Sequence, residues 1–279
     1  MKILSFEDIT SFEQRVLDFL IQREAENCLL LGVMSRIKNC SSQGDEKPFL
    51  AIVESAGKVI GVAVRSDSNR PMIISIMPKE AIDPLSSYVA KNIGSLTGVV
   101  GAAAESEMLV SSLAKQLKRQ KRLHIGMRCF YLDRVQYHGK ASGSLRLAEQ
   151  KNQNIIASWI KAFTIEALKD NNPKGCEESA KHGIEKKEIF IWEDQRPVTM
   201  TMTTGHTPHG IRINNVYTPM ELRNRGYATS CVASISQRCL DEGKKFCFLF
   251  TDVLNPTSNS IYQKIGYKPI CDFSNFILE

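Results

Sequence analysis

One segment late in the chain combines the residue types and spacing that bind an anion. A strand is predicted to end at Pro219, a short basic loop follows, and a helix is predicted from Gly226. The free amides and positive dipole end of that helix face the loop, Gly226 lets a ligand approach the backbone, and Arg223 and Arg225 add charge. Taken alone, the pattern Arg-x-x-Gly-x-Ala also fits an ordinary capped helix with solvated arginines.

A second segment, residues 252–267, follows further along the chain. Asn255, followed by a proline, is predicted to turn the chain out of a strand, and Ser258 is predicted to cap the next helix. Gly266 is predicted to end this helix in the left-handed conformation. Tyr262 lies on the helix between them, where packing against a helix face is the alternative to a functional role.

The spacing of apolar residues predicts the elements that must position these two segments. The first half reads as helices within 6–37 and at 79–93 and 104–121, strands at 49–53, 58–65, 71–77, 98–100 and 123–132, and a loop at 39–47. The second half reads as strands at 144–148, 188–192, 197–203, 211–218, 246–251 and from 268, with helices at 152–168, 176–186, 226–240 and 258–265. The basic run 115–122 is predicted to sit at a helix end.

The two halves show a faint internal repeat. Residues 49–78, a strand, a turn and two strands ending at a proline, parallel residues 189–219. After Pro78 no glycine lets backbone amides approach an anion, so we expect the first copy to have lost its ligand.

The segments 216–229 and 252–267, in this order and at this distance, resemble the GNAT superfamily of acyl-CoA N-acetyltransferases. The resemblance covers residues from about 143 to 279. It implies an α+β fold in which a mixed, mostly antiparallel sheet is flanked by helices. With the internal repeat, it implies two related lobes: a degenerate GNAT-like lobe at 1–140 and a catalytic N-acetyltransferase domain at 143–279.

The resemblance also implies acetyl-CoA as co-substrate, with no metal, and places its parts. The pantetheine arm would pair with the backbone of Val216, Tyr217 and Thr218, and a backbone amide near Val216 would polarise the thioester. The pyrophosphate would be held by Arg223, Asn224, Arg225, Gly226, Tyr227, Ala228 and Thr229.

Two polar residues and one tyrosine would contact the remaining parts of the cofactor. Asn255 would hydrogen-bond the arm near the reacting end, and Asn259 would contact it further along. Tyr262 would protonate the departing thiolate, because a phenol keeps its proton at neutral pH while remaining within acid strength of a thiol.

The general base is left open by the sequence. The strand expected to face the cofactor carries Asn214 and Asn215 and no carboxylate. Glu193 and Asp194 follow an earlier strand, where solvation is the usual fate of acids, and Asp252 can instead cap a turn.

Composition narrows the classes of function. The 279 residues include 36 Lys plus Arg and 30 Asp plus Glu, so the net charge of +6 is mild and spread along the chain, which does not indicate a nucleic-acid binder. No apolar run is long enough for a membrane span and the first residues do not resemble a signal peptide, so a cytoplasmic protein is expected. The eight cysteines include no Cys-x-x-Cys pair, which favours free buried thiols over disulfides or a metal site.

Three hypotheses remain at this point. The first is direct transfer of an acetyl group from CoA to a primary amine on a small molecule or peptide. The second is a catalytically silent acetyl-CoA-binding regulatory module, favoured by the missing base. The third is an aminoacyl-tRNA-dependent relative with two such lobes, against which the intact loop 223–228 counts. The sequence names neither the acceptor nor the oligomeric state.

Overall fold

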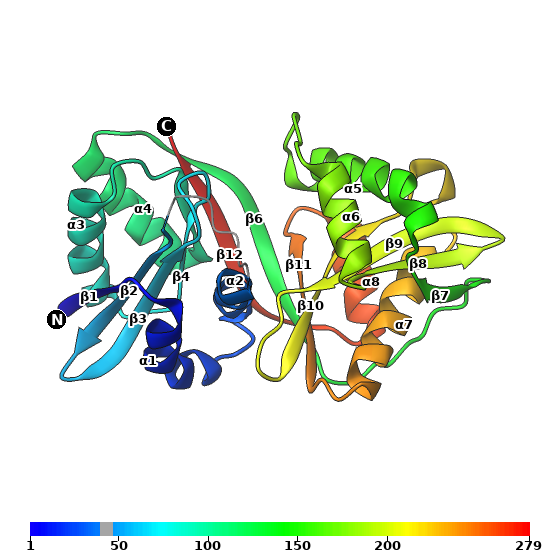
Figure 1. The fold of residues 1–279 in the computed structure, drawn as a ribbon, viewed down its shortest axis with the longest axis horizontal. Helices are drawn as coiled ribbons and strands as arrows, with labels where there is room; N and C mark the ends of the chain where they lie inside the picture. Colours follow the sequence, from blue (N-terminus) through cyan, green and yellow to red (C-terminus); the bar gives the residue numbers. More distant parts are fainter. Residues whose placement is uncertain (40–46) are drawn as a thin grey trace. The chain divides into compact units, whose positions relative to one another are not determined.

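The computed structural model describes residues 1–39 and 47–279, so the loop expected at 39–47 falls almost entirely outside the described residues. The chain forms two compact units (Figure 1). The first consists of residues 1–129, 205–208 and 270–279, and the second of residues 130–204 and 209–269.

The first unit is a sheet with a pair of helices on each face. Its strands lie in the order β1-β2-β3-β4-β5-β12-β6. Val62 and Val64 of β3 pack with α1 and α2, whereas Ala63 packs with α3 and α4, because successive strand residues point to opposite faces. The elements are β1 (Lys2–Phe6), α1 (Ile9–Ile21), α2 (Cys28–Asn39), β2 (Phe49–Ser55), β3 (Lys58–Arg65), β4 (Met72–Ile74), α3 (Ile82–Asn92), β5 (Gly98–Ala102), α4 (Ala103–Leu117) and β6 (Lys121–Leu132).

The second unit repeats this plan, which confirms two related α+β lobes. Its strands lie in the order β7-β8-β9-β10-β11-β6, with only β10 and β11 parallel among β7 to β11. Ile189 and Ile191 pack with α5 and α6, and Phe190 packs with α7 and α8. The elements are β7 (Ser144–Leu147), α5 (Gln153–Leu168), α6 (Cys176–Glu185), β8 (Ile189–Asp194), β9 (Arg196–Thr204), β10 (Gly210–Tyr217), α7 (Tyr227–Asp241), β11 (Phe246–Asp252) and α8 (Pro256–Ile265).

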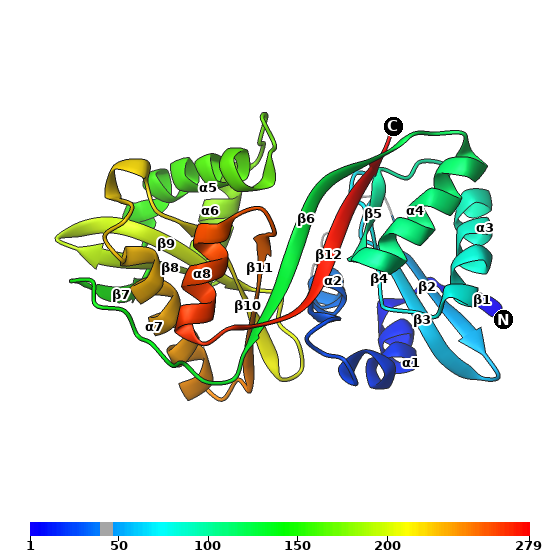
Figure 2. The same cartoon turned by 180° about the vertical axis from the view of Figure 1, so that it is seen from behind.

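The last strand, β12 (Lys268–Leu278), belongs mainly to the first unit. It runs antiparallel to β5 and lies between β5 and β6 (Figure 2), and its Phe276 and Leu278 are buried with α3 and α4. β6 in turn passes from the first unit to the second between Cys129 and Phe130. The units are therefore not the continuous ranges 1–140 and 143–279 expected from the sequence, because strand pairing, not chain order, decides which residues belong together.

Two other local expectations were wrong. No strand was expected at the start of the chain, yet β1 pairs with β2 as a mostly exposed edge strand, and such a strand carries little apolar alternation. The helix expected to reach residue 121 ends at Leu117, because Lys118 adopts the left-handed conformation at φ 53°. The basic run 115–122 is thus divided between a helix end, a turn and the start of β6.

The expected free thiols are confirmed for the seven described cysteines, five of them buried.

The position of β12 predicts that a residue near the end of the chain stabilises the unit that contains its beginning. Replacing Phe276, 6% exposed, by alanine should lower the free energy of unfolding by about 3 kcal/mol, because a buried aromatic ring leaves a cavity. Urea denaturation measures the loss, and hydrogen exchange should show faster exchange in β5. Leu123→Ala, at a position 52% exposed, is the control and should change stability by less than about 0.5 kcal/mol. Unchanged exchange in β5 would contradict the assignment.

Candidate active site

The parallel strands β10 and β11 form a short ladder and then diverge. Residues 210–212 lie opposite residues 246–248, and the pairing ends there although both strands continue. On its other side β10 carries an irregularity between Asn214 and Tyr217, within which Asn215 adopts φ 48°. No residue pattern in this strand predicts the irregularity. Because the β10–β11 ladder ends at residue 212, the backbone of the last residues of β10 has no ladder partner among the described residues on the β11 side, where an extended ligand can pair with it.

The helix after β10 begins with unsatisfied amides. Gly226, at φ 80°, is its N-cap and supplies no side-chain hydrogen bond. The amide of Ser230 donates to the Gly226 carbonyl at 3.0 Å, so the amides of residues 227–229 have no acceptor within the helix. The first turn contains no acidic residue. This end of α7 therefore suits an anion, as expected from the sequence.

The two arginines of the loop differ in their surroundings. Arg223 forms an ion pair with Glu166 of α5 at 2.6 Å and donates from Nε to the carbonyl of Thr218 at 2.9 Å. Arg225 reaches the carbonyl of Glu221 at 3.4 Å and forms no ion pair within the part of the chain that the structure describes. Sequence reasoning missed Glu166, because nothing in the pattern of α5 distinguishes it from a solvated acid.

Tyr227, expected to contact pyrophosphate through its backbone, also anchors the first turn of α7 through its side chain. Its hydroxyl donates to Asp194 Oδ2 at 2.6 Å, and Ser142 donates to the same oxygen at 2.7 Å. The hydrogen bond from Tyr227, followed by that from Ser142, lowers the pKa of Asp194. A carboxylate with a lowered pKa is a weak base, so Asp194 serves to position the helix.

The other candidate bases are also engaged. Glu193 accepts two hydrogen bonds from Arg146, at 2.6 and 2.9 Å, and this contact lowers its pKa. Asp252 accepts from the amide of Leu254 at 2.8 Å, which is the turn-capping role. On β10, the amide nitrogen of Asn214 donates to Thr204 at 3.0 Å, while its Oδ1 is buried without a partner among the described residues.

The start of α8 corrects one expectation. Asn255, not Ser258, is the N-cap: its Oδ1 accepts from the amide of Ser258 at 3.0 Å. Its exposed amide nitrogen makes no hydrogen bond within the described residues, so it can still donate to a ligand. Asn259 instead accepts from the hydroxyl of Thr251 and donates to the carbonyls of residues 252 and 253 at 3.4 Å, so its amide holds the β11–α8 connection.

Tyr262 has the environment of a protonated phenol. Its ring is 9% exposed and packs against Phe130 and Tyr267, with ring centroids 6.5 and 6.0 Å away. Its hydroxyl makes no hydrogen bond to another described group, and burial raises its pKa, so it keeps its proton. It shares one apolar cluster with Val216 of β10 and Val232 of α7, which links α8 to the strand end and the helix above it.

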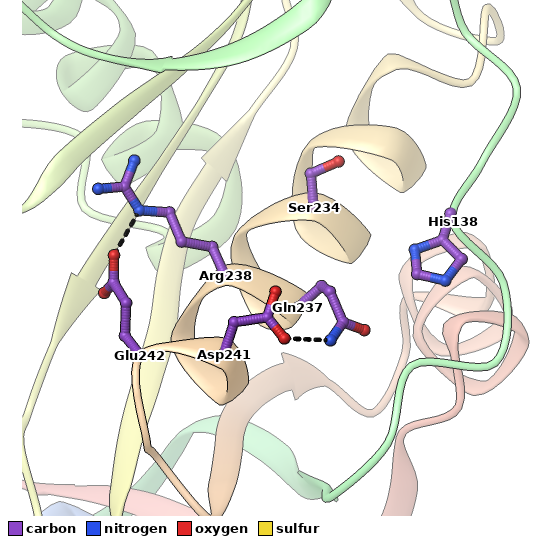
Figure 3. Close-up of a pocket in the computed structure, with 6 residues that line it drawn as sticks. All are labelled: His138, Ser234, Gln237, Arg238, Asp241 and Glu242. Atoms are coloured by element: carbon purple, nitrogen blue, oxygen red, sulfur yellow. Dashed lines mark hydrogen bonds and ion pairs between the residues drawn. The ribbon is translucent and has the colours of Figure 1, made fainter.

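A separate shallow hollow of about 450 Å³ lies beside α7, and Figure 3 shows the residues that line it. It is lined by His138, Ser234, Gln237, Arg238, Asp241 and Glu242, and contains none of the expected site residues. Within the described residues no three His, Cys, Asp or Glu side chains are arranged to hold a metal ion, and none of the helices there is long and apolar enough to cross a membrane.

Comparison with known proteins indicates the fold family. The sequence model of the FR47-like protein family matches residues 195–275, which include β10, α7 and α8. No curated protein sequence matches the chain. Among solved structures, a GCN5-related N-acetyltransferase from Sphaerobacter thermophilus has a TM-score of 0.63 at 14% identity, over 99% of this chain and 95% of its own. The chain has the GNAT fold.

Two further structures match the chain over both units, and the first of them is a GNAT protein. A tandem GNAT protein from the clavulanic acid biosynthesis pathway has a TM-score of 0.54 at 9% identity, over 100% of this chain and 98% of its own. A Drosophila protein has a TM-score of 0.69 at 9% identity, over 99% and 98%. The resemblance to the GNAT superfamily is thus confirmed for the fold of the whole chain, and for the FR47-like region also by sequence.

The contacts of Asp194 predict an acid-sensitive contribution to stability. Because its folded-state pKa is lowered, it stabilises the fold above the unfolded carboxyl pKa of about 3.9, and this contribution is lost as the pH falls through the folded value. Asp194→Asn should therefore lower the urea midpoint at pH 7 and have a smaller effect at pH 3. Both tryptophans, Trp159 and Trp192, lie in the second unit, so their fluorescence reports its unfolding. Asp18→Asn, an exposed acid in α1, controls for the loss of charge. An equal effect at both pH values would contradict this role.

Proposed function

We propose that the protein is an acetyl-CoA-dependent N-acetyltransferase that moves an acetyl group from CoA directly to a primary amine of a small molecule or peptide. The observation that carries the proposal is the divergence of β10 and β11 beside the uncapped first turn of α7. The free strand edge suits an extended pantetheine arm, and the amides of residues 227–229 suit its pyrophosphate.

The second unit supplies the other groups that this reaction needs. The backbone of Val216 and Tyr217 would pair with the arm, while the carbonyl of Thr218 already accepts from Arg223. A β10 amide near Val216 would polarise the thioester carbonyl, and the amide nitrogen of Asn255 would donate to the arm. The buried, protonated Tyr262 would give its proton to the thiolate as the tetrahedral intermediate collapses. The first unit would bind no acetyl-CoA, because α3 follows a 3₁₀ turn, has Asp83 in its first turn and has no N-cap glycine.

A catalytically silent acetyl-CoA-binding module is the second candidate. It is favoured by one observation: Glu193 and Asp194, two of the acids considered as the general base, both have lowered pKa values and defined partners. Such a module would bind acetyl-CoA and release no CoA when amines are added. The two candidates therefore share a binding test and differ in a turnover test.

The binding test uses two glycines with the same backbone role. Gly226 and Gly175 are both left-handed N-caps, of α7 and α6, without a side-chain cap. In calorimetric titration with acetyl-CoA we expect micromolar binding by the unmodified protein, about 8 kcal/mol, and none by Gly226→Asp, whose carboxylate repels the pyrophosphate. Gly175→Asp introduces the same charge into the same conformation and should bind normally. Equal loss in both variants, or no binding by the unmodified protein, would remove the proposal.

The turnover test concerns the proton given to the thiolate. Tyr262→Phe keeps the buried ring and removes only the hydroxyl, so the affinity for acetyl-CoA should stay within about twofold while turnover with an accepted amine falls about 100-fold. Release of free CoA across a panel of primary amines measures turnover. Tyr267→Phe removes a second buried hydroxyl, which contacts Ser236 at 2.7 Å, and serves as the control. Unchanged turnover in Tyr262→Phe would show that another group is the acid.

A further inference from the structure

Glu166, near the C-terminal end of α5, binds a residue of the proposed pyrophosphate loop. Its carboxylate pairs with the guanidinium of Arg223 at 2.6 Å and accepts from the Tyr217 hydroxyl at 3.3 Å. Arg223 also lies 5.7 Å from the centre of the Tyr217 ring. The loop arginine is therefore held between an acid of α5 and the end of β10, and its positive charge is already compensated.

This contact changes how the positive charge near α7 is shared. A phosphate arriving at the first turn meets the amides of residues 227–229 and Arg225, which forms no ion pair among the described residues, whereas Arg223 can reach it only by leaving Glu166. We propose that Glu166 competes with the cofactor phosphates for Arg223 and thereby sets the affinity for acyl-CoA. This inference rests on the proposed function, since it concerns the same site.

The exposure of the pair makes such an exchange feasible. The side chains of Arg223 and Glu166 are 38% and 43% exposed, so water screens their attraction and either partner can be replaced. The pyrophosphate as a whole carries two negative charges against one on the carboxylate, and it offers more acceptor oxygens to a guanidinium. Arg223 can therefore transfer from Glu166 to the ligand while Nε continues to hold the Thr218 carbonyl.

The experiment is calorimetric titration of the full chain with acetyl-CoA and with acetyl-pantetheine, which has the thioester and the arm but no pyrophosphate. Glu166→Gln should tighten acetyl-CoA binding about threefold, because the competing charge is gone, and leave acetyl-pantetheine binding unchanged. In an Arg223→Gln background the same change should have no effect, which a double-mutant cycle measures. Glu185→Gln, an exposed acid in α6, makes the same change in net charge and should leave the affinity as it is.

The outcomes separate this inference from the proposed function. If the unmodified protein binds acetyl-CoA and Glu166→Gln binds it equally or more weakly, Glu166 is a structural partner of Arg223 and the competition is refuted. Tighter binding of acetyl-pantetheine as well would also overturn it, because the effect would not involve phosphate. If neither protein binds acetyl-CoA, the proposed function and the inference fall together. Glu166→Ala, which also removes the competing charge, should reproduce the tighter binding should the glutamine variant fold poorly.

Discussion

A strand that leaves its neighbour must find other partners for its backbone, and this constraint governs the second unit. β10 pairs with β11 over residues 210–212 only, and the irregularity between Asn214 and Tyr217 turns the strand end further from a regular ladder. Unpaired N–H and C=O groups in the middle of a protein are costly unless water or a ligand satisfies them. The first amides of α7, after the loop that follows β10, also have no acceptor within their element, since Gly226 provides no side-chain cap. Two sets of unsatisfied backbone groups thus lie at consecutive points of the chain, and a molecule with an extended polar arm and an anionic group would satisfy both.

The side chains around this opening mostly hold it in place. Tyr227 and Asp194 fasten the first turn of α7, Arg146 holds Glu193, and Asn255 caps α8. Acids employed in this way have lowered pKa values and are poor acceptors of a proton from an ammonium group. In the proposed reaction the chemistry would therefore be concentrated in backbone groups and in Tyr262, whose burial keeps it protonated. Such an arrangement would lower the barrier mainly by orientation and by fixed dipoles, with little dependence on a strong base.

The two units have the same arrangement of elements but differ in the residues before the helix that follows their fourth strand. Both units have two helices between their first two strands and a parallel pair in the middle of the sheet. In the first unit, however, α3 continues directly from a 3₁₀ turn with Glu80 and Asp83 nearby, so acids stand where the second unit has glycine and arginines. The chain's last strand completes the sheet of this first unit, with Phe276 and Leu278 in its core. The folding of the N-terminal unit thereby depends on residues at the other end of the chain.

The sequence alone determined the features that are local. Apolar periodicity placed nearly every helix and strand of both units, and the order of Arg223, Gly226, Asn255 and Tyr262 indicates the fold family and predicts an anion site at the start of α7. Features that depend on contacts between residues far apart in the chain could not be predicted from the sequence. Which sheet receives β12, where β10 separates from β11, and that Glu166 pairs with Arg223 are all decided by contacts between distant segments, to which local spacing is blind. Ser258 is a good cap residue by type, but the N-cap of α8 is Asn255. The proline at the first helical position starts the helix two residues earlier than expected.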